Sequence, residues 1–233
     1  MTRLALLFDL DGTLIDSIEL LLDCMRFAFA DRTHAPTRAE WVAGIGTPLR
    51  TQLAEWAVEE ADVDALVARY REYQELHLER LTTAYPGVLD TLAWAHANGH
   101  ATGIVTSKGK VMTARSLGHV GLANAFDTIV TYEETTRHKP LADPVVLALE
   151  RLNIPASRAL FTGDSPHDMH SGRAANVATA AATWGPFTRD ELAPAQPTYW
   201  LTSITELPAI VSGLASGPQP PFKPFPREHR PTP

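Results

Sequence analysis

The sequence predicts an α/β fold: a doubly wound parallel β-sheet flanked by helices, with a helical segment inserted after the first strand. Three observations predict it. A short apolar run, residues 4–8, ends at two acidic residues, Asp9 and Asp11. From residue 88 to residue 211, strand-like runs alternate with helix-like segments, which is typical of a parallel sheet. Between residues 36 and 82 there is helical spacing but no convincing strand.

Composition limits the class of protein. The 233 residues are 45% hydrophobic and 20% charged, which suits one globular domain or a domain with a smaller insert. The net charge of -7 argues against binding to nucleic acid, which needs clustered Lys and Arg. Cys24 is the single cysteine, so no internal disulfide can form. No long uncharged apolar run is present, which argues against a membrane span. We expect a cytoplasmic monomer or homodimer.

After the first strand the chain is expected to be helical. Asp16 or Ser17 can cap a helix that runs to about residue 30. Apolar residues then recur at spacings of three and four in three further segments, around Trp41, Leu53 and Leu66. Several helices are more than a crossover between two strands needs, so we expect residues 16–83 to form a helical cap.

The remainder alternates in the order expected of a Rossmann-like sheet. The predicted helices cover residues 88–98, 110–117, 144–152, 167–175 and 203–211, and the predicted strands residues 101–105, 128–131, 159–162, 177–181 and 199–201. We therefore expect a core of residues 1–15 and 84–212 and a tail of residues 213–233. The tail is rich in proline, which favours an extended, solvated chain.

Two carboxylates follow the first strand, at the edge where open α/β sheets bind ligands. Asp9 and Asp11 stand two residues apart, so both can face one crevice. Gly12 and Thr13 then provide a tight turn and a hydroxyl. Close carboxylates repel one another, which favours a bound cation. A charged turn without chemistry would give the same pattern.

Two later segments carry hydroxyl or lysine side chains. Thr106, Ser107 and Lys108 follow the second predicted strand of the sheet, and such groups suit phosphoryl oxygens. Lys139 precedes a proline in a turn before a helix, a weak signal by itself. A polar turn explains either segment taken alone.

A further strand, residues 159–162, is followed by two acids. Asp164 and Asp168 are four residues apart, with glycine and proline nearby, and oxygen ligands of this kind favour a hard cation. Asp168 alone could simply be an acid at a helix start. His167 and His170 lie three apart on the same predicted helix, but the oxygen-rich surroundings argue against zinc.

Taken in order, the four segments resemble the motifs of the haloacid dehalogenase superfamily, in its phosphatase branch. Asp9-Leu10-Asp11-Gly12-Thr13 matches the D-x-D-G-T motif residue for residue. The resemblance covers about residues 3–212, and it implies magnesium-dependent hydrolysis through an aspartyl-phosphate. Two positions depart from the common pattern: Ser107 stands where relatives often carry Asn, and Ala142 replaces a proline.

The resemblance also implies roles for single residues. Asp9 would be the nucleophile and Asp11 the general acid and base, with Thr106 and Lys139 completing the catalytic set. Magnesium would bind Asp9, Asp164 and the main-chain carbonyl of Asp11, with Asp168 acting through a water or holding Lys139. The expected substrate-binding residues are Gly12, Thr13, Ser107, Lys108 and Arg50. For Arg50 taken alone, a solvated arginine at a helix start is the favoured interpretation.

The substrate is expected to be a small phosphorylated metabolite. Residues 103–108 and 182–185 look most like those of phosphoglycolate phosphatases and related inorganic pyrophosphatases. The first choice is 2-phosphoglycolate and the alternative is pyrophosphate. Residues 44–48 look like the specificity loop of the cap.

Four rival functions remain to be weighed. A dehalogenase would not need Asp11, because halide leaves unprotonated. A phosphonatase would need a cap lysine, and residues 15–82 contain none. A sugar phosphomutase keeps all four motifs, so the sequence leaves it open. A non-catalytic magnesium-binding module that uses the tail should have lost a catalytic acid, and none is missing.

Overall fold

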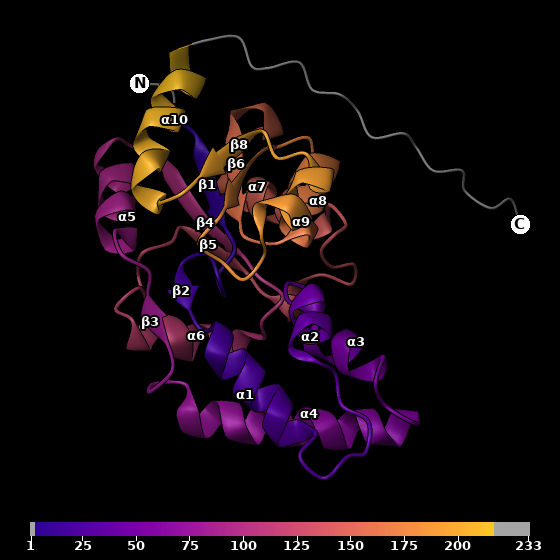
Figure 1. The fold of residues 1–233 in the computed structure, drawn as a ribbon. Helices are drawn as coiled ribbons and strands as arrows, with labels where there is room; N and C mark the ends of the chain where they lie inside the picture. Colours follow the sequence, from indigo (N-terminus) through magenta and orange to yellow (C-terminus); the bar gives the residue numbers. More distant parts are fainter. Residues whose placement is uncertain (1–2, 217–233) are drawn as a thin grey trace, which may run out of the picture.

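Six parallel strands form the centre of the protein, in the order β5-β4-β1-β6-β7-β8 (Figure 1). The computed structural model describes residues 3–216. The strands are β1 (Ala5–Phe8), β4 (Ala101–Val105), β5 (Thr128–Val130), β6 (Ala159–Gly163), β7 (Ala178–Ala182) and β8 (Tyr199–Leu201). The predicted doubly wound parallel sheet is therefore confirmed.

Alternation along the strands supplies apolar side chains to both faces of the sheet. In β1, Leu6 and Phe8 belong to the apolar cluster that includes α5 and α10, whereas Ala5 and Leu7 belong to the cluster that includes α7. The helices around the sheet are α5 (Val88–Ala97), α6 (Lys110–His119), α7 (Asp143–Leu152), α8 (Pro166–Ala174), α9 (Arg189–Leu192) and α10 (Leu207–Ser216). Single 3-10 turns lie at Tyr132–Glu134, Ala156–Arg158, Ala193–Ala195 and Ile204–Glu206.

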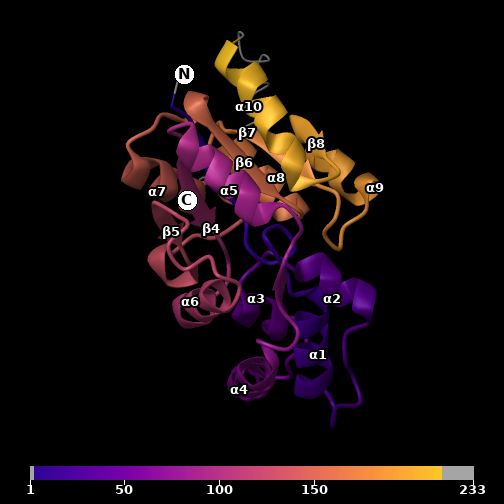
Figure 2. The same ribbon diagram turned by 90° about the vertical axis from the view of Figure 1, so that its left-hand side faces the viewer.

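The segment expected to form the cap contains four helices, at the lower end of both ribbon views (Figures 1 and 2). They are α1 (Ile18–Ala28), α2 (Arg38–Gly44), α3 (Leu49–Ala54) and α4 (Glu60–His77). Trp41, Leu53 and Leu66 are almost fully buried in an apolar cluster made mostly of cap residues. The predicted helices of this segment are thus present.

A short antiparallel ribbon joins the two parts. Strand β2 (Ile15–Asp16) pairs with β3 (Thr83–Ala84), so that Ile15 faces Ala84. Sequence reasoning did not predict this ribbon. We propose that residues 16–83, which start and end at it, are a separate domain.

The end of the chain differs from the prediction. Helix α10 continues through residues 213–216, so the expected tail boundary at residue 213 is wrong, because Leu214 still packs against the sheet's apolar cluster. The rest of the predicted tail, residues 217–233, lies outside the described residues. None of the described helices has the length and apolar character needed to cross a membrane.

The strand order explains where a site can form. From β1 the chain reaches β4 on one side of the sheet and later crosses to β6 on the other side. Neighbouring connections therefore diverge beyond the carboxyl end of β1. Such switch points are where open α/β sheets bind ligands.

Candidate active site

Three predicted residues directly follow adjacent strands at this switch point. Asp9 follows β1, Thr106 follows β4 and Asp164 follows β6. The sheet ladder continues into two of them: the Asp9 amide donates to the Thr162 carbonyl at 2.9 Å, and the Thr106 amide to the Val130 carbonyl at 3.0 Å. Their side chains are consequently anchored by the rigid sheet.

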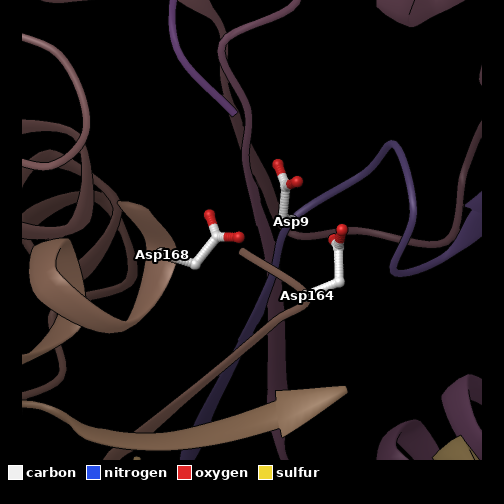
Figure 3. A group of neighbouring side chains, drawn as sticks. All are labelled: Asp9, Asp164 and Asp168. Carbon is white, nitrogen blue, oxygen red and sulfur yellow. The ribbon is translucent and has the colours of Figure 1, made fainter. Parts of the chain in front are cut away.

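Three buried carboxylates meet at this edge (Figure 3). Asp9, Asp164 and Asp168 each offer an oxygen, and these oxygens lie within 4.8 Å of one another. Asp168 is held by the start of α8, where the Ser165 hydroxyl donates to its Oδ2 at 2.6 Å and the Ser165 amide at 3.1 Å. A helix cap thus fixes one member of the group.

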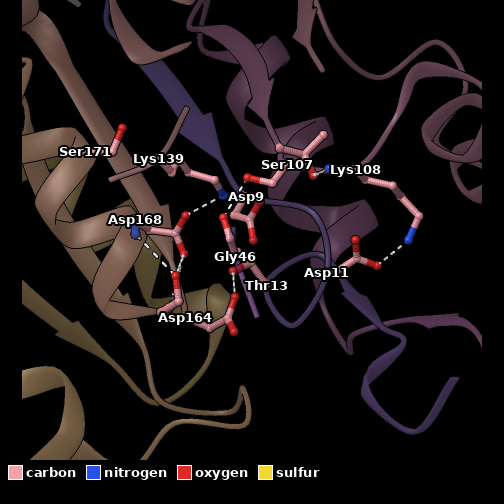
Figure 4. Close-up of polar contacts among 12 residues, drawn as sticks. Asp9, Asp11, Thr13, Gly46, Ser107, Lys108, Lys139, Asp164, Asp168 and Ser171 are labelled. Atoms are coloured by element: carbon pink, nitrogen blue, oxygen red, sulfur yellow. Dashed lines mark hydrogen bonds and ion pairs between the residues drawn. The ribbon is translucent and has the colours of Figure 1, made fainter. Parts of the chain in front are cut away.

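Lys139 lies between two of these carboxylates (Figure 4). Its Nζ is 2.8 Å from Asp9 Oδ1 and 2.7 Å from Asp168 Oδ1. Burial lowers the pKa of Lys139, but the negative charges of Asp168 and Asp9 outweigh burial and leave the pKa raised. One ammonium beside three acids leaves an excess of negative charge.

The pKa values of two of these acids are raised, chiefly by burial. Burial raises the pKa of Asp9 to about 7, against the lowering effect of Lys139. Burial, followed by the charges of Asp168 and Asp9, raises the pKa of Asp164 well above its usual value. A further positive charge at this place would favour the ionised forms.

Asp164 has the free oxygen that a cation would need. Thr13 Oγ1 donates to Asp164 Oδ1 at 2.6 Å, while Asp164 Oδ2 is buried without a hydrogen-bond partner. Gly12 and Gly185 leave room beside it, since a Cβ at either position would come within 2.4 Å of an Asp164 side-chain atom. Clustered carboxylate oxygens are the ligands magnesium prefers, so these residues fit the ion.

Asp11 is directed elsewhere (Figure 4). Its Oδ1 accepts hydrogen bonds from Ser17 Oγ and from Lys108 Nζ, both at 2.6 Å. Among the described residues, the carboxylate group of Asp9, Asp164 and Asp168 does not include the Asp11 side chain. The Asp11 side chain is therefore held by Ser17 and Lys108, apart from the three carboxylates.

A pocket of about 480 Å³ opens beside Asp9 and Asp11. Asp9, Asp11, Thr106, Ser107 and Lys108 line its sheet side. The cap lines the other side with Trp41, Ile45, Leu49, Arg50, Val67, Tyr70, Arg71 and Gln74, among others. A substrate in this pocket would touch both parts of the chain.

Arg50 does line the pocket, but it is paired. Its guanidinium forms ion pairs with Glu60 and Asp64 of the cap. Arg71 also lines the pocket and has no ion-pair partner among residues 3–216. Sequence reasoning did not single out Arg71, because nothing local distinguishes it from other helix-surface arginines.

One hydrogen bond connects the predicted specificity loop to the sheet side, and a second starts just before the loop, in α2. Ser107 Oγ donates to the Gly46 carbonyl at 2.6 Å, and His167 Nε2 donates to the carbonyl of Ala43 in α2 at 3.1 Å. His167 is thus occupied by main chain, and the group of potential metal ligands found in the described residues contains no histidine. Ser17, Ser165 and Gly185 are the other site residues that sequence reasoning missed.

The sequence of this chain is similar to those of known proteins. The family model of haloacid dehalogenase-like hydrolases matches residues 6–182. The chain is 33% identical over 204 residues to pyrophosphatase PpaX of Bacillus velezensis, covering 87% of this chain and 94% of that protein. It is 31% identical over 211 residues to pyrophosphatase PpaX of Oceanobacillus iheyensis, covering 91% and 98%.

Solved structures give the same fold. A predicted phosphatase from Clostridium acetobutylicum is 26% identical, with a TM-score of 0.81 over 91% of this chain and 100% of that chain. A predicted phosphoglycolate phosphatase from Haemophilus somnus is 22% identical, with a TM-score of 0.81 over 90% of this chain and 99% of that chain. At that identity the second likeness concerns the fold alone.

Proposed function

Because the chain belongs to the haloacid dehalogenase-like hydrolase family and its relatives are phosphatases, we propose that it is a magnesium-dependent phosphatase acting through Asp9. The observation that carries the proposal is the buried contact of Lys139 with Asp9 and Asp168, beside the partnerless oxygen of Asp164. This arrangement supports a carboxylate nucleophile next to a cation site.

Each residue has a proposed role. Asp9, Asp164 and the Asp11 carbonyl would hold magnesium, which when bound neutralises phosphoryl oxygens. Asp168 orients Lys139 through their 2.7 Å contact. Thr106 and Lys139 stabilise the oxygens of the transferring group.

The reaction is proposed to run in two steps. An Asp9 oxygen attacks phosphorus and the bond to the leaving oxygen breaks, with Asp11 protonating that oxygen when it belongs to an alcohol, giving an aspartyl-phosphate. Water then attacks the same phosphorus, Asp11 takes its proton, and the bond to Asp9 breaks. The cap covers the pocket and contacts the leaving group.

Pyrophosphate is the leading substrate candidate. The support is the similarity to pyrophosphatases PpaX over about nine-tenths of the chain. The first choice from the sequence, 2-phosphoglycolate, is retained as the second candidate. Arg71 favours it, because an unpaired guanidinium in the pocket can bind a carboxylate.

The test is phosphate release with magnesium from pyrophosphate, 2-phosphoglycolate and a panel of sugar phosphates. Asp9→Asn should abolish turnover and leave the fold intact, while Asp16→Asn, which removes a nearby exposed carboxylate, should retain activity. Turnover by Asp9→Asn at the wild-type rate would refute the mechanism.

The same panel separates the remaining alternatives. Phosphate that moves between positions on a sugar without release would indicate a sugar phosphomutase. Magnesium binding without any turnover would indicate a non-catalytic magnesium-binding module. The cytoplasmic location and the monomeric or homodimeric state stay predictions, the latter to be measured by sedimentation.

A further inference from the structure

Lys108 is a lysine with very little contact with solvent. Its side chain is 6% exposed, and its Nζ lies 2.6 Å from Asp11 Oδ1, whose own side chain is 13% exposed. The main chain of Lys108 is fixed as well, since its amide donates to Thr106 Oγ1 at 3.1 Å and its carbonyl accepts from the Tyr132 amide at 3.2 Å. The ammonium is therefore held in place at the pocket wall.

The position of this ammonium relative to Asp9 is informative. In Figure 4, Lys139, Asp168 and Asp164 lie on one side of Asp9, and Asp11 and Lys108 lie on the other. Asp9, Asp11 and Lys108 all line the pocket. A phosphoryl group attacked by Asp9 has its leaving oxygen roughly in line on the side away from Asp9. Because Asp11 and Lys108 line the same pocket as Asp9, a leaving group in that pocket can reach them.

Asp11 has one oxygen available for proton transfer. Oδ1 already accepts two hydrogen bonds, from Ser17 and Lys108, so a transferred proton belongs on Oδ2. Lys108, in turn, uses one N–H for Asp11 and has others to offer. The departing group thus meets a fixed positive charge as well as a proton-transfer group.

Leaving groups differ in whether they need a proton or a positive charge. An alcohol leaves as a strongly basic alkoxide unless it receives a proton in the same step. A phosphate or a carboxylate leaves as a stable anion and needs its negative charge neutralised.

We propose that Lys108 stabilises the leaving group, and that the Lys108–Asp11 pair favours substrates whose leaving group departs as an anion, namely phosphoanhydrides. This rests on the proposed function and deepens it. In the first step the bridging P–O electron pair moves to the leaving phosphate, whose charge Lys108 offsets, and Asp11 donates no proton. In the second step Asp11 Oδ2 takes a proton from the attacking water and passes it to solvent.

The first test compares Lys108→Met with Lys108→Arg on pyrophosphate and on glycerol 1-phosphate, whose leaving group is a neutral alcohol once protonated. For pyrophosphate, Lys108→Met should lose about 100-fold in kcat with little change in KM. If the wild type turns over glycerol 1-phosphate, the loss of kcat in Lys108→Met should be about ten times smaller for this substrate than for pyrophosphate. If the wild type does not turn it over, that result also agrees with the stated preference. Lys108→Arg should restore most of the pyrophosphate activity, because it keeps the charge.

Lys110→Met is the matched control. Lys110 is exposed at the start of α6 and does not line the pocket. Its replacement by Met should therefore leave the turnover of both substrates unchanged. An equal loss on both substrates in Lys108→Met, or a loss confined to KM, would overturn the proposal by showing a structural or ground-state role.

A second test leaves Lys108 intact. Asp11→Asn should release a burst of about one phosphate per active site from pyrophosphate and then stall, because only the second step needs Asp11. Absence of the burst would contradict the proposal. If the wild type released no phosphate from any substrate, the proposed function itself would fail. Normal wild-type activity with an unaffected Lys108→Met would reject the leaving-group role alone.

Discussion

Lys139 and Asp9 form a buried ion pair, with Nζ 2.8 Å from Oδ1 and both residues about 3% exposed. The proposed nucleophile is therefore oriented by a cation that belongs to the protein. The same ammonium contacts Asp168. Both the stability of the fold and the orientation of the nucleophile depend on the Lys139 side chain, so its removal should affect stability and turnover.

Replacing Lys139 by Met should destabilise the fold by about 3–5 kcal/mol and abolish turnover, because two buried carboxylates lose their counter-charge. Urea denaturation measures the first effect. Adding Asp168→Asn to Lys139→Met should recover part of the stability without restoring activity. The exposed control Lys110→Met should behave as wild type, and a stable Lys139→Met variant would contradict the buried ion-pair account.

Magnesium should raise the melting temperature of the wild type by several degrees, since an ion bound only to the folded state at 100 times its Kd contributes about 2.7 kcal/mol. Asp164→Asn should lose most of this gain, because it removes the charge at the partnerless oxygen. Asp90→Asn, an exposed acid of α5, is the control. Equal magnesium-dependent shifts in all three proteins would place the ion elsewhere.

Stability without metal should depend on pH through Asp9. Burial raises the pKa of Asp9 from 3.8 to about 7, so between these values the folded chain holds a proton that the unfolded chain has lost. Stability must then fall as pH rises through this window. In a chelator, the melting temperature should fall more steeply from about pH 5 to about pH 7 in the wild type than in Asp9→Asn. Parallel profiles for the two would count against a raised pKa.

Gly12→Ala should impair both magnesium binding and turnover. Gly12 has a φ of +84°, and a Cβ there would lie 2.4 Å from Asp164 Oδ2. Gly99→Ala separates the two causes, because Gly99 has a φ of +75° with nothing within 4 Å of the added atom. Both variants should lose about 1 kcal/mol of stability from backbone strain. Only Gly12→Ala should weaken magnesium-dependent stabilisation, and an equal effect in Gly99→Ala would rule out crowding as the cause.

Much of the fold could be predicted because its signals are local. The apolar run of β4 ends at Val105, as its sequence indicates, and three of the four polar motifs begin where such a run stops. Ribbon β2–β3 was missed because each strand has two residues and the pairing of Ile15 with Ala84 leaves no local pattern. The boundary at residue 213 failed because the composition of the chain changes before α10 ends.

The candidate site was predictable in its residues but not in its contacts. The order of the motifs pointed to Asp9, Lys139 and Asp164. The direction of the Asp11 side chain depends on Ser17 and Lys108, and the latter is distant in sequence. The ion pairs of Arg50 with Glu60 and Asp64 likewise need the packing of α3 beside α4.

The ribbon β2–β3 has a consequence for how such proteins diversify. The chain leaves the sheet at Ile15 and returns at Ala84, directly opposite. Because departure and return are neighbours, a segment of another length or sequence can replace residues 16–83 without rethreading the strands. In such an architecture the helical insert can vary while the strands, and the residues at their carboxyl ends, stay in place.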